Sequence, residues 1–330
     1  MNREGGNGGD APTRAPPYAY TPIIDRPRLA WPNGARLAVY VGLNVEHYEF
    51  GKPAVSVLPD TATRDPDPLN YGWRDYGVRV GVWRLMELLD TYRIRASVLL
   101  NADVCRLYPR IVEEGVKRDW AWLAHGKNNS MFAGPEPPTL SVDAERRYLR
   151  EVVATIRDAT GQEPRGWLGP LGLSETAHTL DLLAELGVRY VLDWGNDDQP
   201  YPLRVVRGRM LSVPYALEVN DLPLFLKKAV SGPEFGQLLI DQFDVLYEES
   251  ARSGRVLSIG LHPFVAGQPF RHKYAERALA HITAHEDVWL TTSDEIAAWY
   301  LGHYDDQATA PNAAGMRVAG DAGSREGKGT

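Results

Sequence analysis

Polar side chains that can transfer protons follow several apolar runs of the chain. Asn44 and Glu46 come at the end of the first run, His125 and Asn129 after a later one, and His262 after a run near the C-terminal end. A carboxylate and two imidazoles that meet can supply a base and an acid for hydrolysis, or ligands for a divalent metal. Each residue alone is weak evidence, because polar residues after a strand are commonly solvated. Together they predict an active site.

The elements that would position these residues are short apolar runs alternating with amphipathic segments. Alternation of this kind predicts parallel βα units, whose strands all end at one rim, where active sites of α/β barrels lie. Seven or eight units favour an α/β barrel over an open sheet. The runs predicted as strands are 35–44, 94–101, 120–125, 165–169, 188–194, 209–215, 255–262 and 287–292.

Amphipathic segments between these runs predict the helices. The clearest spans 141–161, with Ser141 as its N-cap and Gly161 as its stop. We expect residues 1–20 to form a disordered or draped arm, residues 21–304 one barrel domain, and residues 305–330 a flexible tail. The other predicted helices are 78–93, 103–118, 174–187 (with Ser174 as its N-cap), 232–253, 272–285 and 293–303.

Composition excludes several classes of protein. The chain has 330 residues, 43 acidic and 36 basic, and its net charge of −7 argues against a nucleic-acid binder. Cys105 is the single cysteine, so no intrachain disulfide can form, and its apolar neighbours predict a buried, inert thiol. The sequence shows no apolar run of membrane-spanning length and no apolar export signal. We therefore expect a cytoplasmic protein without a membrane or nucleic-acid partner.

Three segments carry a resemblance to a known family: LNVEHYEFG (43–51), AHGKNNS (124–130) and LSIGLHPFVAGQPFR (257–271). Over residues 30–303 the chain resembles the polysaccharide deacetylase (NodB-homology) superfamily, and within it the PuuE-type allantoinase and cyclic imidase branch. The resemblance implies a distorted (β/α)7 barrel, hydrolysis of an amide C–N bond at its carboxyl rim, and a homo-oligomer.

The family motifs assign roles to individual positions. The base position of the sugar deacetylases falls on Asn44, and a metal-binding Asp position falls on Glu46. His125 matches the first metal-binding His, Asn129 stands where the second would be, and His262 matches the catalytic acid. An amide in place of an imidazole weakens transition-metal affinity. The resemblance thus implies either no cofactor or one divalent, zinc-like metal held by Glu46, His125 and Asn129.

The predicted reaction is attack of water on a carbonyl of a small cyclic amide, imide or ureide. Glu46 would act as the base, or as a metal ligand, while His125 orients the water and His262 protonates the leaving nitrogen. Aromatic side chains near the strand ends offer flat walls for a planar ring. The residues predicted to contact the substrate are Asn44, Asn129, Trp167, Trp194 and Asp198.

Two alternatives stay open at this point. The first is a metal-dependent N-deacetylase of acetylated amino sugars, which needs good metal ligation and an Asp base where this sequence has Asn129 and Asn44. The second is a catalytically inactive barrel that binds a ring-shaped ligand without turnover.

Overall fold

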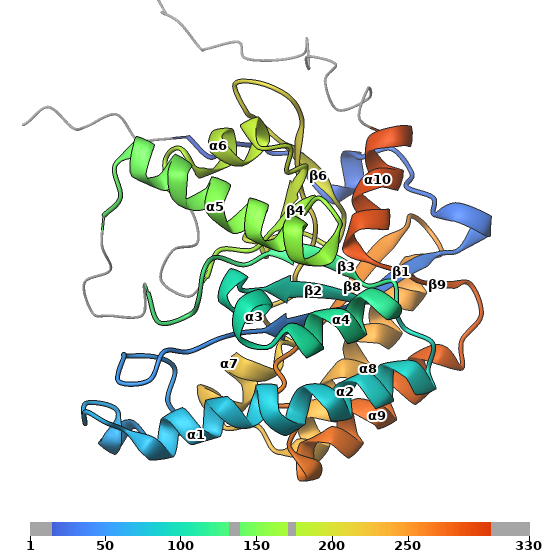
Figure 1. Cartoon of the computed structure of the whole chain (residues 1–330). Helices are drawn as coiled ribbons and strands as arrows, with labels where there is room; N and C mark the ends of the chain where they lie inside the picture. Colours follow the sequence, from blue (N-terminus) through green and yellow to red (C-terminus); the bar gives the residue numbers. More distant parts are fainter. Residues whose placement is uncertain (1–14, 132–138, 171–175, 305–330) are drawn as a thin grey trace, which may run out of the picture.

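A parallel β-sheet that curls into a half-barrel, with helices on its outer face, forms the centre of the computed structural model (Figure 1). The structure describes residues 15–131, 139–170 and 176–304. The predicted tail and most of the predicted N-terminal arm lie outside these residues, as does Ser174. Pro17 and Tyr18, at the described end of that arm, contact Arg204 and Trp194.

The sheet follows the order β6-β7-β5-β4-β3-β2-β1-β8, with β9 paired to the start of β1. Every strand pair is parallel except β6 and β7. The predicted barrel is therefore confirmed as a curled half-barrel, and β6 is an additional strand that the apolar pattern did not predict. The strands are β1 Leu37–Val45, β2 Ala96–Leu100, β3 Ala121–Ala124, β4 Gly166–Trp167, β5 Tyr190–Val191, β6 Tyr201–Leu203, β7 Met210–Ser212, β8 Arg255–Leu261 and β9 Val288–Leu290.

Ten α-helices lie among the described residues, and a π-helical turn at Gly77–Gly81 joins α1 to α2. The predicted helix at 103–118 is divided by Tyr108, and Pro109 starts its second half. Helices α1 and α7 were not predicted. The helices are α1 Pro68–Tyr76, α2 Val82–Thr91, α3 Ala102–Leu107, α4 Pro109–Lys117, α5 Val142–Thr160, α6 Thr179–Glu185, α7 Asp221–Leu226, α8 Gly232–Glu249, α9 Pro269–Thr283 and α10 Ser293–His303.

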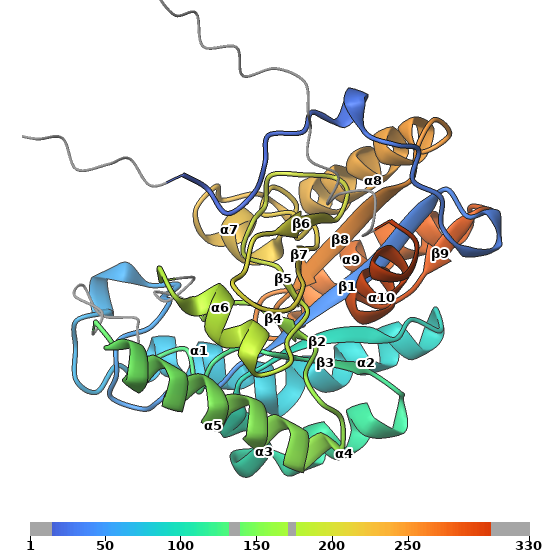
Figure 2. The same ribbon diagram turned by 90° about the horizontal axis from the view of Figure 1, so that it is seen from above.

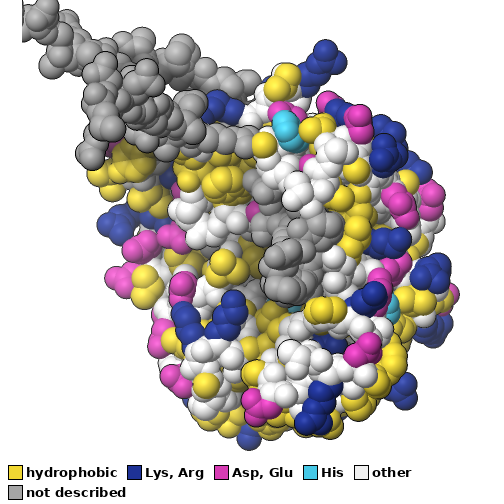
Figure 3. All heavy atoms as spheres, turned by 90° about the vertical axis from the view of Figure 1, so that its left-hand side faces the viewer, with side chains coloured by type: hydrophobic (Ala, Val, Ile, Leu, Met, Phe, Trp, Pro, Cys, Tyr) yellow, Lys and Arg dark blue, Asp and Glu magenta, His cyan; other side chains and the backbone are white. Residues whose placement is uncertain are grey.

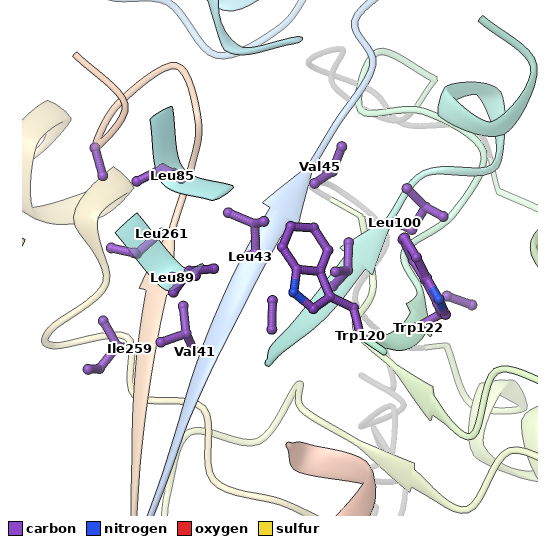
Figure 4. Close-up of a cluster of buried hydrophobic side chains, with 14 of the residues drawn as sticks. Val41, Leu43, Val45, Leu85, Leu89, Leu100, Trp120, Trp122, Ile259 and Leu261 are labelled. Atoms are coloured by element: carbon purple, nitrogen blue, oxygen red, sulfur yellow. The ribbon is translucent and has the colours of Figure 1, made fainter. Parts of the chain in front are cut away.

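Strand β1 is apolar along its length because both of its faces are buried. Val41 and Leu43 belong to the larger core between sheet and helices, where Leu85 and Leu89 of α2 pack beside Leu261 of β8 (Figure 4). Alternate residues of the same strand point into the barrel. This alternation decides which polar residues beyond the strand ends turn inward.

The interior of the barrel is filled beneath the rim. The rings of Tyr40 and Tyr215 are buried there, and the Tyr40 hydroxyl donates to the carbonyl of Pro214. Gly42 leaves room for this filling, because a Cβ on it would lie 2.9 Å from the Tyr215 ring.

The amino end of the barrel is closed by α10 and by the segment that precedes β1. The backbone N–H of Ser293 donates to Ser97 Oγ at the start of β2, and the Ser293 hydroxyl pairs with the Tyr190 hydroxyl. Trp31 donates its indole N–H to the carbonyl of Arg255. Figure 2 shows α10 beside β1 and β9 at this end. The amino end of the barrel is therefore covered by described residues.

The remaining predictions from composition concern the membrane and Cys105. Among the described residues, none of the helices has the length and apolar character needed to cross a membrane. Cys105 is partly buried, and burial raises the pKa of its thiol to about 12. The thiolate is therefore suppressed at neutral pH, which agrees with an inert cysteine.

Candidate active site

The three side chains predicted to be catalytic each follow a strand that the sequence predicted. Glu46 comes directly after β1, His125 directly after β3, and His262 directly after β8. Each continues the inward-pointing alternation of its strand. All three are buried at the carboxyl end of the half-barrel, with exposed fractions of 8% or less. The structure therefore brings together the three residues predicted to be catalytic.

Glu46 lies at the centre of this group. Its Oε1 is 3.2 Å from His125 Nε2 and 3.9 Å from His262 Nε2, and its Oε2 accepts a hydrogen bond of 2.7 Å from the Tyr48 hydroxyl. Burial alone would raise the pKa of Glu46, but His262, His125 and the Tyr48 hydrogen bond outweigh it and lower that pKa. The side chain is a carboxylate at neutral pH and can accept a proton.

His262 is held by a buried aspartate on α7. Its Nδ1 is 2.6 Å from Asp221 Oδ1, and its backbone N–H donates to Asp221 Oδ2 over 2.8 Å. Burial acts to lower the pKa of His262, whereas the charges of Asp221 and Glu46 raise it, and the net shift is upward. With Nδ1–H committed to Asp221, the Nε2–H of the protonated ring faces Glu46.

Asp221, which holds His262, is a residue of this group that was not predicted from the sequence. It is fully buried and begins a helix of six residues. A short helix carries little hydrophobic periodicity, so the segment did not stand out. The available signal was an Asn220-Asp221 pair after the apolar run at 209–215, the same pattern that singled out Glu46 and His125.

Asn129, predicted as a third metal ligand, presents its N–H group to Glu46. Its Nδ2 donates to Glu46 Oε1 over 2.5 Å, and its Oδ1 accepts from Asn101 Nδ2 over 3.0 Å. The orientation of Asn101 is fixed in turn, because its Oδ1 accepts the backbone N–H of His47 and its Nδ2 also donates to the carbonyl of His125. The lone pairs of Asn129 therefore point away from Glu46.

The three predicted metal ligands consequently do not complete a metal site. Glu46 and His125 offer ligand atoms 3.2 Å apart, a spacing that suits neighbours around one ion, but Asn129 offers a donor. The range predicted from the sequence, no metal or one divalent ion, is compatible with this pair of ligands.

Asn44, which the resemblance aligned with a base position, is engaged in hydrogen bonds to the barrel itself. Its Nδ2 donates to the Tyr215 hydroxyl over 2.9 Å and to the carbonyl of Leu261 over 3.3 Å. It ties β1 to β8 and to the tyrosine that fills the barrel. We therefore expect Asn44 to stabilise the barrel beneath Glu46. The sequence predicted that it contacts the substrate.

The structure contradicts two further predicted substrate contacts, those of Trp167 and Asp198. Trp167 is completely buried between the sheet and the helices, because it occupies an outward-pointing position of β4. The carbonyl of Asp198 accepts the N–H of Val256, six residues before His262, which places it roughly 20 Å away along β8. Trp194 packs edge-on against Tyr18, with ring centroids 5.4 Å apart.

A small cavity opens beside Glu46. It has space for about one water molecule. An arginine, three tyrosines and two carboxylate residues line it, so it is polar enough to hold that water. The lining residues are Glu46, Tyr48, Tyr71, Arg74, Asp75, Val78 and Tyr108.

Two glycines of the π-helical turn hold the segment that follows His262. A Cβ on Gly81 would lie 2.0 Å from the carbonyl oxygen of Pro263, and a Cβ on Gly77 would lie 2.9 Å from the backbone N of Phe264. Only glycine permits this approach of two backbones. The turn therefore fixes the loop that carries His262.

The outer surface at this end of the molecule carries mixed charge. Figure 3 views the side toward which β1 runs, and basic, acidic and hydrophobic side chains are interspersed around its edge. This face presents no single-sign field that would select a strongly charged polymer.

No family model matches the sequence. Among curated proteins the chain is 27% identical to a putative polysaccharide deacetylase of Schizosaccharomyces pombe, covering 83% of this chain and 93% of that protein. It is also 27% identical to a peptidoglycan deacetylase of Helicobacter pylori, covering 72% of this chain and 88% of that protein.

Two solved structures are similar over most of their length. One is a probable polysaccharide deacetylase from Pseudomonas aeruginosa PAO1, with a TM-score of 0.75, 28% identity and coverage of 84% of this chain and 96% of that one. The other is PuuE allantoinase, with a TM-score of 0.76, 27% identity and coverage of 89% and 99%. These comparisons confirm the resemblance to the polysaccharide deacetylase superfamily.

Proposed function

Starting from this place in the polysaccharide deacetylase (NodB-homology) superfamily, we propose that the chain hydrolyses amide C–N bonds other than peptide bonds. The observation that carries the proposal is the buried group in which the Glu46 carboxylate faces His262, itself paired with Asp221 at 2.6 Å. A carboxylate with a lowered pKa beside an imidazole with a raised pKa forms a base and an acid in opposite protonation states at one pH.

The proposed reaction begins with water beside Glu46. The carboxylate takes one proton from the water as its oxygen bonds to the carbonyl carbon, and the carbonyl electron pair moves onto oxygen. When the intermediate collapses, the C–N bond breaks and the leaving nitrogen takes the proton from His262 Nε2. A linear amide gives a carboxylic acid and an amine as two molecules, whereas a cyclic amide gives one ring-opened molecule that carries both new groups. His125 and Asn129 keep Glu46 Oε1 in place, so they position the base.

Two substrate classes are supported by different observations. The names of both curated relatives and of the Pseudomonas structure favour N-deacetylation, the first of the two alternatives left open above, over cleavage of a cyclic amide. The likeness to PuuE allantoinase and the incomplete metal set at Asn129 favour a small cyclic amide. Both reactions use the same base and acid.

A substrate panel separates the two classes. Allantoin, hydantoin, dihydrouracil and succinimide are assayed beside N-acetylglucosamine oligomers, each with added zinc and with EDTA. Turnover of a ring that persists in EDTA supports the cyclic-amide class, whereas acetate release that EDTA abolishes supports the deacetylase class. Binding of a ring without turnover under any condition would contradict the hydrolase proposal and favour the inactive barrel.

The cytoplasmic location and the homo-oligomer remain predictions. Size-exclusion chromatography with light scattering tests the second, and a mass equal to one chain of 36.7 kDa would contradict it.

A further inference from the structure

A second cluster of ligating side chains lies between α8 and α9, away from the rim. Asp244 comes from α8, and His281 and the nearby His285 come from α9 and the residues just after it. One ligand atom from each of the three lies within 4.8 Å of the other two. Two imidazoles four residues apart in the chain, with a carboxylate opposite, form a ligand set typical of zinc and its neighbours.

The hydrogen bonds around the cluster orient the imidazoles. His285 Nδ1 is 2.8 Å from the carbonyl oxygen of His281, so Nδ1 carries the proton and Nε2 carries the lone pair. This is the arrangement in which metal-binding histidines are commonly found, with the second ring nitrogen donating to a backbone carbonyl. His281 Nε2 is 2.7 Å from Asp244 Oδ1, so an oxygen and a nitrogen ligand already face each other.

An aromatic side chain of α8 limits the movement of both imidazoles. Phe243 packs edge-on against His281 and His285, with ring centroids 5.6 and 4.8 Å apart. The Asp244 side chain is half exposed, which leaves it able to rotate and leaves the cluster open to ions from solvent. Ligand atoms around a four-coordinate zinc lie about 3.4 Å apart. Side-chain rotations that move the ligand atoms by roughly 1 Å would bring them from within 4.8 Å of one another to this spacing.

We propose that Asp244, His281 and His285 bind one divalent transition metal of the zinc class, with water completing the coordination. The ion would join α8 to α9. It is remote from catalysis, because Asp287, two residues after His285, accepts hydrogen bonds from Arg36 and Leu37 at the amino end of β1. Glu46 follows the opposite end of that strand, roughly 30 Å away.

Zinc titration by calorimetry tests the proposal on the full chain after treatment with EDTA. The variant is His285→Ala, and the matched control is His303→Ala, since His303 Nδ1 makes the same bond to the carbonyl of Trp299, four residues earlier. We expect His285→Ala to lose one zinc equivalent or to bind it at least 10-fold more weakly, while His303→Ala binds like the wild type. Identical isotherms for the wild type and His285→Ala would overturn the site.

Two further measurements separate this site from the rim and from misfolding. A site at Glu46 and His125 would keep its own equivalent in His285→Ala, so a fall from two equivalents to one still supports the proposal. Asp244→Asn changes a half-exposed side chain, and it should reduce zinc affinity at least 5-fold with an unchanged circular dichroism spectrum. Equal zinc-induced shifts of the melting temperature in wild type, His285→Ala and Asp244→Asn would contradict the site.

Discussion

Two histidine–aspartate pairs of nearly equal length lie at different places in the molecule. His262 and Asp221 are 2.6 Å apart at the carboxyl rim, and their side chains are 6% and 0% exposed. His281 and Asp244 are 2.7 Å apart on the outer helices, and their side chains are 33% and 51% exposed. The bond lengths are alike, so the difference between the pairs comes from their surroundings.

Burial couples the charges of His262 and Asp221 strongly, whereas exposure leaves His281 and Asp244 able to change partners. Water cannot replace Asp221 as the partner of His262, and a third charge, Glu46, lies 3.9 Å from the same imidazole. The exposed pair is solvated and screened by salt, so it contributes little and can exchange its proton for an ion. The energetic and chemical role of a histidine–carboxylate contact therefore depends on how far its two side chains are exposed.

The largest expected effect comes from removing the acid at the buried pair. His262→Ala should lower kcat/KM about 100- to 10,000-fold, since the leaving nitrogen would lose its proton donor. The measurement is steady-state kinetics on whichever amide of the panel turns over. His303→Ala, which changes a histidine on the outer surface of α10, is the matched control and should leave kcat/KM unchanged. Equal kcat/KM values for the two variants would contradict the role of His262 as the acid.

The next effect is on stability. Asp221→Asn should lower the free energy of unfolding by about 3 kcal/mol, because it removes a buried charge on which His262 and two backbone N–H groups depend. Urea denaturation followed by circular dichroism measures the change. A loss below about 1 kcal/mol would mean that burial does not distinguish this pair from the exposed one.

The pH dependence of the reaction sharpens the comparison further. The reaction needs Glu46 without its proton and His262 with one, so kcat/KM should fall below the lowered pKa of Glu46 and above the raised pKa of His262. The plateau should therefore extend beyond the ordinary values of 4.5 and 6.5 on both sides. In Asp221→Asn the alkaline limb should move toward lower pH. An unmoved limb would contradict the role of Asp221 in holding the imidazolium.

The same shifts fix the sign of the pH effect on stability. The raised pKa of His262 contributes stability that is complete below pH 6.5 and is lost as the pH rises through the folded-state pKa. The lowered pKa of Glu46 contributes stability above pH 4.5 that is lost as the pH falls through its folded-state pKa.

The smallest effect belongs to the exposed pair. Asp244→Asn in the absence of metal should change the free energy of unfolding by less than about 1 kcal/mol, because solvent replaces the lost partner. The same urea denaturation measures it. A decrease in the free energy of unfolding as large as that of Asp221→Asn would contradict the conclusion that exposure weakens the second pair.

The sequence predicted the fold and the centre of the site because both follow from long apolar runs. β1, β3 and β8 are long or clearly bounded, and the residues just beyond them are Glu46, His125 and His262. Asp221 was missed because it begins a helix of six residues, which is too short to carry a hydrophobic period.

The errors around the site have a different physical origin. Trp167 was predicted at the rim because it is an aromatic residue near the end of the predicted strand 165–169, but β4 has only two residues and alternation turns this one outward. Asp198 was assigned to the rim because it follows β5, yet the loop returns to the amino half of β8. Neither the face of a very short strand nor the path of a loop is encoded in local pattern.

The filled interior beneath the rim has a kinetic consequence. Among the described residues, Tyr40 and Tyr215 fill the interior and α10 packs against its amino end, so we expect substrate entry and product exit to share the carboxyl side. If the substrate is a linear amide, the acid and the amine leave through the opening that the next substrate molecule uses, so each should compete with substrate and product-inhibition patterns should show the order of release. If the substrate is a cyclic amide, its single ring-opened product should compete with substrate in the same way.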